Sequence, residues 1–349
     1  MKGIRKIAPY IPGNQPNYPN MIKINTNENP YPPSPKVEKA LKEFKVEDLK
    51  RYSSLDNQLL KNALADKHQL LPEQLIIGNG SDEVLAFCFL AFFNSSESIL
   101  FPDITYGFYK VWADLFHIPF KELPLTTDFH IDFSDYNQPN GGIVIANPNA
   151  PTGLFKSSEA VRTLLKKHPD VIVIIDEAYA EFAEETMLPL LDEFSNLIIV
   201  RTLSKSQSLA GLRIGYAIGD PRYIAVMESV KSSFNPYSVD LLAEKLAAAA
   251  VEDTSYYQKI NEEICKTREW FVSKLATFGF QSLDSQTNFV LTTHKTIDVP
   301  ALYHFLEEQN IFVRYFAKPA RLKKYLRISI GTREEMEKTA AAIDCFLKE

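Results

Sequence analysis

The sequence is poor in the residues that build disulfide frameworks and metal sites. Its 349 residues include three cysteines, Cys88, Cys265 and Cys345, which lie far apart and form no CxxC pair. The six histidines occur singly, without an HExxH motif. We therefore expect free thiols in a reducing compartment and no bound metal.

Long apolar runs and clusters of basic residues are also missing. The longest apolar run, Val84 to Phe93, has ten residues, which is too short to cross a bilayer. Lys and Arg are scattered and the formal net charge is −6, which argues against nucleic-acid binding. Because the N-terminus also lacks a charged-then-apolar signal pattern, we expect a cytoplasmic protein that binds neither membranes nor nucleic acid.

Apolar strand patterns alternate with helical patterns through much of the chain. The strand runs show no polar alternation, which is typical of a mostly parallel sheet covered on both faces and predicts an α/β fold. These runs are residues 75–78, 98–101, 142–146, 171–175 and 197–200. Helices are expected near 34–44, 106–116 and 157–167 and from about Ser81, with Ser34 as the N-cap of the first.

Three segments follow from the change of pattern along the chain. Residues 1–33, rich in Pro, Asn and Tyr, predict an arm that packs with a small domain or with a partner. Residues 34–253 predict a large domain, and residues 254–349 a smaller α+β domain that opens with a helix near 254–278. Its other elements are expected as strands near 288–291, 311–316 and 325–330 and helices near 300–309 and 333–347.

One segment carries most of the chemical information. Arg201-Thr-Leu-Ser-Lys-Ser-Gln-Ser-Leu-Ala-Gly-Leu-Arg213 offers a lysine, Lys205, with the hydroxyls of Thr202 and Ser204 and the fork of Arg213. Upstream, five β-branched residues end in Asp176, and Tyr179 follows. A lysine that can form an imine, an acid for a pyridinium nitrogen and an arginine for a phosphate are what pyridoxal phosphate (PLP) requires. We therefore expect a PLP enzyme in which Lys205, Asp176 and Tyr179 are catalytic.

Three weaker motifs fit the same cofactor but also have simpler explanations. Gly80, Ser81 and Asp82 follow a strand and open a helix, so their N–H groups could bind a phosphate, although an ordinary turn explains them as well. Tyr106 could stack on the cofactor ring or lie in the core. Asn149 could bind the ring oxygen O3′, although turn chemistry accounts for its Pro- and Gly-rich surroundings.

Two arginines, Arg314 and Arg327, are flanked by apolar strand residues. An arginine in such a setting is costly to bury without an anion. Salt bridges within the fold and a carboxylate or phosphate of the substrate are both possible partners.

Together these residues resemble the fold type I aminotransferases, and within them the histidinol-phosphate aminotransferase family, over nearly the whole chain. The resemblance implies a large domain with a mostly parallel, seven-stranded-type sheet and a smaller α+β domain. It also implies that Tyr10 and Asn27 approach the substrate and that Tyr52 reaches across a homodimer to the partner's cofactor phosphate. Arg327 would bind the substrate carboxylate and Arg314 the substrate phosphate.

One departure from the family pattern concerns the ring oxygen. The family usually reads Asn-Asn-Pro-Thr-Gly, whereas Ala150 stands here in place of the asparagine nearest the proline. Either Asn149 supplies the hydrogen bond to O3′ or Tyr179 acts alone.

The reaction that the resemblance implies is transamination of histidinol phosphate with 2-oxoglutarate to imidazole acetol phosphate and glutamate, a step of histidine biosynthesis. Lys205 would move the proton. A threonine-phosphate decarboxylase or an aromatic or broad-specificity aminotransferase on the same fold is the nearest alternative. A PLP-carrying regulator would need an appended DNA-binding domain, for which we expect no room. A nicotinamide dehydrogenase fits poorly, because Glu83 stands where its third glycine should be.

Overall fold

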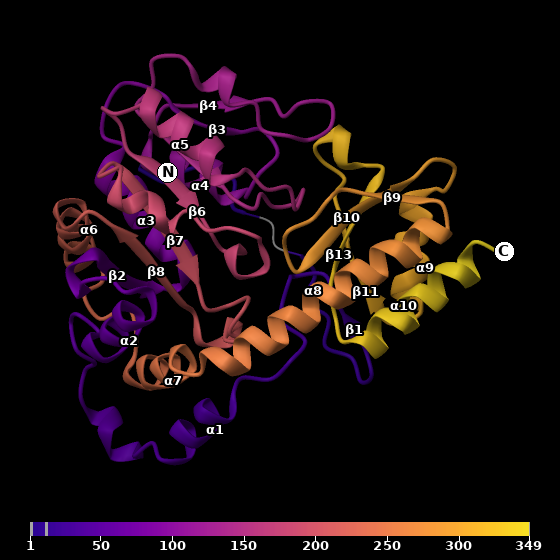
Figure 1. The fold of residues 1–349 in the computed structure, drawn as a ribbon, viewed down its shortest axis with the longest axis horizontal. Coiled ribbons are helices and arrows are strands. Elements are labelled where there is room, and N and C mark those ends of the chain that lie inside the picture. Colours follow the sequence, from indigo (N-terminus) through magenta and orange to yellow (C-terminus); the bar gives the residue numbers. More distant parts are fainter. Residues whose placement is uncertain (1–2, 11–12, 349) are drawn as a thin grey trace.

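Apolar strands buried on both faces form the larger of the sheets (Figure 1). The structure is a computed structural model that describes residues 3–10 and 13–348. The seven strands lie in the order β2 (Leu75–Asn79), β8 (Ile214–Gly219), β7 (Leu197–Thr202), β6 (Val173–Asp176), β5 (Gly142–Ala146), β3 (Ile99–Pro102) and β4 (Phe120–Leu123). Strand β8 is antiparallel to both of its neighbours, and the other pairs are parallel. The predicted mostly parallel sheet is confirmed.

Successive residues of these strands enter two different cores. In β6, Val173 and Ile175 belong to one apolar cluster and Ile174 to the other. The first cluster lies under α1 (Pro35–Lys42), α2 (Gln58–His68), α5 (Ser158–Lys167) and α7 (Leu241–Val251). The second lies under α3 (Gly80–Phe92), α4 (Phe108–Phe116) and α6 (Pro221–Phe234). Coverage on both faces is the reason why the strands carry no polar alternation.

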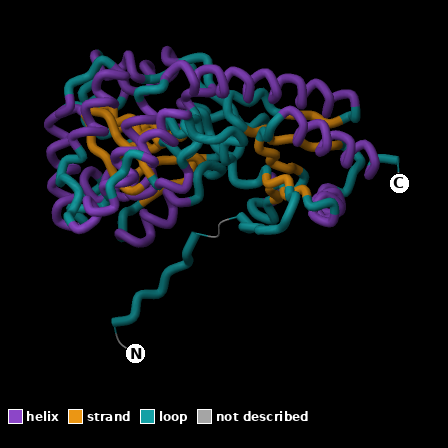
Figure 2. The backbone as a smooth tube through the Cα atoms, turned by 90° about the horizontal axis from the view of Figure 1, so that it is seen from below, coloured by secondary structure: helices purple, strands orange, loops and turns teal. Residues whose placement is uncertain are grey.

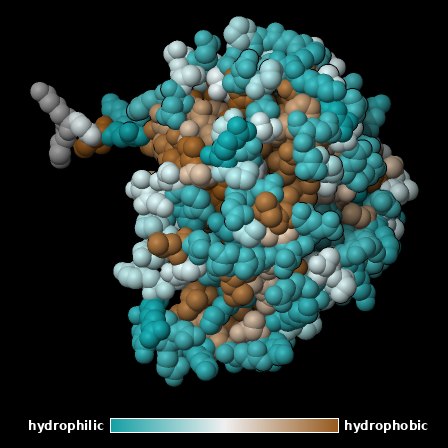
Figure 3. Space-filling view, turned by 60° about the vertical axis from the view of Figure 1, so that its left-hand side comes forward, coloured by the Kyte–Doolittle hydropathy of each residue, from teal (hydrophilic) through white to brown (hydrophobic). Residues whose placement is uncertain are grey.

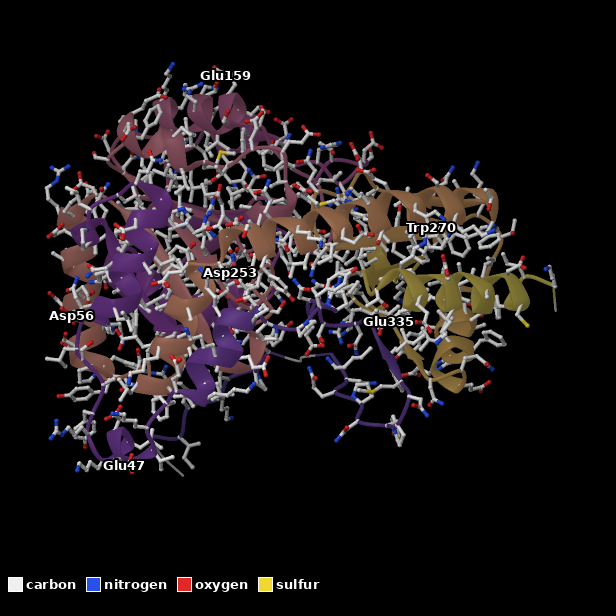
Figure 4. All side chains as sticks on the ribbon, turned by 60° about the horizontal axis from the view of Figure 1, so that its bottom comes forward. Glu47, Asp56, Glu159, Asp253, Trp270 and Glu335 are labelled. Carbon is white, nitrogen blue, oxygen red and sulfur yellow. The ribbon has the colours of Figure 1, made fainter. Side chains whose placement is uncertain are left out.

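A smaller antiparallel sheet follows in the order β12 (Arg314–Tyr315), β13 (Tyr325–Ser329), β10 (Phe289–His294) and β9 (Phe280–Ser282). Its apolar cluster includes residues of α8 (Thr254–Thr277), α9 (Val299–Glu308) and α10 (Arg333–Phe346). Figure 4 shows α8 running from Asp253, beside the helices of the large sheet, to Trp270, beside those of the smaller sheet. The predicted long helix is confirmed.

The N-terminal arm joins the smaller sheet region. Strand β1 (Ile22–Lys23) pairs in parallel with β11 (Ile311–Phe312). Residues 3–10 have neither helix nor strand and project from the body of the molecule in Figure 2. The domain boundaries at residues 33/34 and 253/254 stay predictions. Within residues 3–10 and 13–348, no helix is long and apolar enough to cross a membrane.

The expected elements differ from the structure in detail. Helix α1 begins after Ser34 as predicted, but the Ser34 side chain makes no capping hydrogen bond; its backbone N–H donates to the Tyr257 hydroxyl instead (3.0 Å). The strand expected at 311–316 is two short strands, because β11 pairs with the arm and β12 with β13. The shortness of both strands reflects this change of partner at Val313.

Glycine allows β8 to lie against the first turn of α3. A Cβ placed on Gly215 would lie 2.2 Å from the Ser81 nitrogen and 2.4 Å from the Gly80 carbonyl carbon. Both contacts are with backbone atoms, so no side-chain rotation could relieve them. The glycine at position 215 therefore allows Ser81 to approach β8 closely.

We predict that Gly215→Ala destabilises the protein by about 1–3 kcal/mol, the usual cost of overpacking. Urea unfolding of purified protein measures this. Gly211→Ala is the matched control, since a Cβ at Gly211 would meet nothing within 4 Å. Coincident unfolding curves for the two variants would show that the close approach at Gly215 is not required.

Candidate active site

An inner pocket lies where three neighbouring parallel strands of the large sheet end. Strands β5, β6 and β7 finish at Ala146, Asp176 and Thr202, and ligands of open α/β sheets bind at such carboxyl ends. The pocket is lined by Ser81, Asp82, Tyr106, Ala146, Pro148, Ala150, Asp176, Ala178, Tyr179, Thr202, Ser204, Lys205 and Arg213. Nine of the residues predicted from sequence for cofactor binding are thus brought together.

Asp176 is a buried carboxylate without a cationic partner. Its Oδ2 accepts a hydrogen bond from the Tyr109 hydroxyl (2.8 Å) and its Oδ1 one from the Ala178 N–H (3.2 Å). No ion pair involves it within the described part of the chain. Burial raises the pKa of Asp176 to about 6, although these two hydrogen bonds lower it. Such a group is stabilised by a ligand that presents a protonated nitrogen.

The other end of the pocket suits an anion. Arg213 lies beside the first turn of α3, with its Nη2 3.0 Å from the Asp82 carboxylate. The Arg213 backbone is in the left-handed region (φ 56°), a conformation that residues other than glycine rarely adopt. The Thr202 hydroxyl donates to Ser204 Oγ (3.0 Å) at the same end. An arginine, hydroxyls and a helix N-terminus are groups that bind phosphate in proteins.

Lys205 lies between the inner pocket and a second, outer pocket. Its Nζ donates to the Thr26 carbonyl (3.2 Å), and its own backbone carbonyl accepts from Asn29 Nδ2 (3.0 Å). Burial, with the nearby Arg327 as the next cause, lowers the pKa of Lys205 to about 8. An amine with this pKa is partly neutral near pH 7, as a nucleophile or base must be.

Two tyrosines border the inner pocket. The Tyr106 hydroxyl donates to Asp82 (2.6 Å), which ties the tyrosine to the anion end. The Tyr179 hydroxyl accepts from Asn27 Nδ2 (2.8 Å), and its ring lies edge-on against Phe289. Burial raises the pKa of both tyrosines, so both keep their protons at neutral pH.

The outer pocket brings together the four predicted substrate residues, Tyr10, Asn27, Arg314 and Arg327. Arg327 is buried. Its Nη2 donates to the Asn25 carbonyl (3.0 Å), while its Nε has no hydrogen-bond partner among the described residues. The guanidinium groups of Arg314 and Arg327 both lie against the ring of Phe316. Two guanidinium groups that lie against one ring in the same pocket favour an anionic ligand.

Three predicted cofactor residues do not line the inner pocket. Gly80 supports it indirectly, because a Cβ there would lie 2.6 Å from Arg213 Nη2. Asn149 points elsewhere: its Oδ1 accepts from Thr105 (2.8 Å) and its Nδ2 donates to the Ile104 carbonyl (3.0 Å). Tyr52 is 81% exposed. The Asn149 side chain therefore holds its own loop against residues 104 and 105.

Two interactions at the site were not anticipated from the sequence. Tyr109, which holds Asp176, follows Tyr106 by one helical turn, and that spacing could have indicated it. Glu177, directly after Asp176, forms a buried ion pair with Arg201, directly before Thr202 (2.7 Å). This pair connects the ends of β6 and β7, and only tertiary structure reveals it.

The comparisons with known proteins agree with this geometry. The chain matches the family of class I and II aminotransferases over residues 19–343. The chain belongs to this family. It is 48% identical to the histidinol-phosphate aminotransferase of Lactococcus lactis subsp. cremoris (strain SK11) over 345 residues, which cover 99% of this chain and 97% of that protein.

Solved structures confirm the predicted fold type I architecture of this aminotransferase. The histidinol-phosphate aminotransferase of Sinorhizobium meliloti, in complex with pyridoxal-5′-phosphate, is 25% identical with a TM-score of 0.84, covering 94% of this chain and 91% of that one. The enzyme of the same name from Clostridium acetobutylicum has a TM-score of 0.87 at 24% identity, covering 94% and 99%.

We predict that Asp176→Asn stabilises the cofactor-free protein at alkaline pH. The pKa of Asp176 in the folded state lies about two units above its ordinary value of 3.8, so the folded protein loses stability as the pH rises from about 4 through about 6. At pH 8 the variant should be more stable by about 2–3 kcal/mol, and below pH 4 the difference should vanish.

Urea unfolding of cofactor-free protein at pH 3.5 and pH 8 measures this difference. Asp170→Asn, at an exposed carboxylate, is the control and should change stability little at either pH. Equal stability of Asp176→Asn and the unmodified protein at pH 8 would contradict the idea of an uncompensated carboxylate.

Proposed function

We propose that this chain transfers the amino group of histidinol phosphate to 2-oxoglutarate, with PLP as its cofactor, in histidine biosynthesis. The observation that carries the proposal is the position of Lys205, between a pocket with an uncompensated acid and a pocket with two arginines. The 48% identity to a histidinol-phosphate aminotransferase over nearly the whole chain supports the substrate.

The inner pocket fits PLP at both of its ends. Asp176 would face the ring nitrogen, and Arg213 with Ser204 and the N-terminus of α3 would bind the phosphate. When bound, PLP supplies an electron sink for the carbon that carries the amino group. The raised pKa of Asp176 supports this assignment, because a protonated ring nitrogen would provide the cation that the carboxylate lacks.

The residues of the chain would divide the remaining work. Lys205, with a pKa of about 8, would take the proton from the substrate carbon and return it, and the contact of Asn29 with its carbonyl fixes the base of its side chain. Arg314 and Arg327 would bind the anionic groups of both substrates in turn, since a guanidinium donates hydrogen bonds to a carboxylate and to a phosphate in the same planar geometry. The arm residues at the outer pocket would exclude water.

We predict that Lys205→Ala abolishes turnover, because no other lysine lines the inner pocket in the described part of the chain. An absorbance scan of purified protein with PLP, before and after adding histidinol phosphate, is the companion measurement. The unmodified protein should show a visible band that histidinol phosphate shifts, whereas Lys205→Ala should show neither the band nor turnover. Lys110→Ala, at an exposed lysine, should behave as the unmodified protein.

Other outcomes of this experiment separate the alternatives. A band that another amino acid shifts, but histidinol phosphate does not, would replace the substrate and keep the aminotransferase. Carbon dioxide release from threonine phosphate would favour the decarboxylase. Appreciable turnover by Lys205→Ala would contradict the proposed role of the lysine.

We further propose that the chain forms a homodimer in the cytoplasm. Exposed apolar side chains lie near Tyr52 or Tyr237 in the sequence, and the rings of these two tyrosines stack with 4.6 Å between centroids. They are Val46, Leu49, Leu55 and Phe234. Figure 3 shows apolar groups on this side of the molecule, and in Figure 4 the labels Glu47 and Asp56 mark the segment on its outer edge. A partner subunit would cover these groups and receive Tyr52 near its cofactor phosphate.

We predict that two inactive variants restore activity when they are combined. In a mixed dimer, the subunit with Tyr52→Ala keeps Lys205, and the subunit with Lys205→Ala lends it an intact Tyr52. Random pairing would make about a quarter of all sites intact. Activity after co-expression should therefore exceed the sum of the separate variants. Additive activities would contradict a site shared between subunits.

A further inference from the structure

The chain lacks the usual amide donor beside the ring oxygen of the proposed cofactor. Ala150 lines both pockets and offers only a methyl group. The neighbouring Asn149 cannot take over, because its side chain is already used by Thr105, Ile104 and Thr152. Its oxygen accepts one hydrogen bond and its nitrogen donates two, which exhausts the N–H groups of the amide.

Tyr179 is the side-chain donor of the inner pocket that lies next to Ala150, whereas Ser81, Ser204 and Arg213 belong to the anion end. Thr202 and Ser204 bond to each other at the anion end, and Tyr106 donates to Asp82. The Tyr179 ring is buried and held edge-on by Phe289, with 5.2 Å between centroids, so its hydroxyl has a fixed position. What remains to be set is the direction of the hydroxyl proton.

Asn27 sets that direction through its contact with Ser329. The backbone N–H of Asn27 donates to Ser329 Oγ (2.9 Å), which leaves the serine proton for Asn27 Oδ1 (2.8 Å). With the amide oxygen facing Ser329, the amide nitrogen faces Tyr179 and donates to its hydroxyl oxygen (2.8 Å). A hydroxyl that accepts from an amide keeps its own proton free to donate elsewhere.

The backbone around Asn27 reinforces this orientation. Its φ of 57° lies in the left-handed region, which asparagine tolerates better than most residues. Its carbonyl accepts from Asn288 Nδ2 (3.0 Å), and its side chain is nearly inaccessible. The residue is therefore held by Ser329 of β13 and by Asn288, the residue before β10.

We propose that Asn27 is a positioning residue for Tyr179: with Ser329 it directs the phenol proton to the ring oxygen, so that Tyr179 alone does what Tyr179 and an asparagine at position 150 would otherwise share. The inference rests on the proposed PLP cofactor. It assigns Asn27 a function toward the cofactor, whereas the resemblance implies contact with the substrate.

The arrangement also connects the ring oxygen to the substrate arginine. Arg327 and Ser329 are two residues apart on β13, so their side chains lie on the same face of the strand. Arg327 contacts the Asn25 carbonyl and Ser329 contacts Asn27. If β13 moved when Arg327 bound an anion, the movement would pass from Ser329 to Asn27 and from Asn27 to Tyr179.

The test is a pH titration of the visible absorbance of the PLP-loaded protein. A hydrogen bond donated to the negatively charged ring oxygen stabilises the cofactor after the proton beside that oxygen has been lost. Removal of the donor therefore raises the pH at which half of the cofactor has lost this proton, which is the midpoint of the titration. Tyr179→Phe should raise the midpoint by about one unit, and Asn27→Ala by about half a unit to one unit. In the double variant, Asn27→Ala should add nothing to Tyr179→Phe.

Three further variants sharpen the result. Asn25→Ala removes an equally buried amide of the same segment that bonds to the Asn14 carbonyl and the Thr26 hydroxyl rather than to Tyr179, and it should leave the midpoint unchanged. Ala150→Asn, added to Asn27→Ala, should lower the midpoint again by restoring a second donor. Ser329→Ala should raise it in the same direction as Asn27→Ala, and it serves if Asn27→Ala does not fold.

Two results would overturn the inference. Asn27→Ala and Ser329→Ala with unchanged midpoints and a higher KM for histidinol phosphate would make Asn27 a substrate residue only. A midpoint shift that persists in full in the Tyr179→Phe background would show that Asn27 does not act through Tyr179. If the unmodified protein shows no visible band with PLP, the proposed function itself fails, and the inference fails with it.

Discussion

The ionised carboxylate of Asp176 at the buried end of β6 is the constraint on which the site depends. The strand that carries it consists of β-branched residues packed on both faces, so the side chain cannot turn to solvent. Tyr109 and the Ala178 N–H supply hydrogen bonds but no charge. The buried charge therefore lowers the free energy of unfolding, and a bound ligand with a protonated nitrogen would raise it again.

The neighbouring Glu177 has the cationic partner that Asp176 lacks. Glu177 is as deeply buried, yet it accepts from Arg201 Nε and Nη2 and from the Met187 N–H and the Thr186 hydroxyl. One acid of the pair is fully compensated on one side of β6, and the other is left for a ligand. Because Arg201 precedes Thr202, the compensated pair also fixes the strand end that carries Ser204 and Lys205.

Sequence reasoning predicted residues that the structure brings to one pocket. Asp176 was predicted at the end of an apolar run, and Thr202 and Lys205 from the hydroxyls, lysine and arginine of one segment. Asn27 and Asn149 show the limit, since the amide of each is assigned by contacts that no local pattern encodes: Asn27 with Ser329, 302 residues away, and Asn149 with Thr105. The antiparallel β8 was also missed, because strand direction depends on connections rather than on composition.

The part of the arm that follows β1 has no regular structure and joins these parts. In four successive contacts, the Asn25 carbonyl meets Arg327, the Thr26 carbonyl meets Lys205, the Asn27 amide meets Tyr179 and Asn29 meets the Lys205 backbone. Strands could not supply these acceptors, because their carbonyls are used within the sheet. An irregular segment keeps its carbonyls available for two partly buried cations. The irregular backbone at residues 25–29 is therefore a requirement of the site, and the sheets on either side determine where it must run.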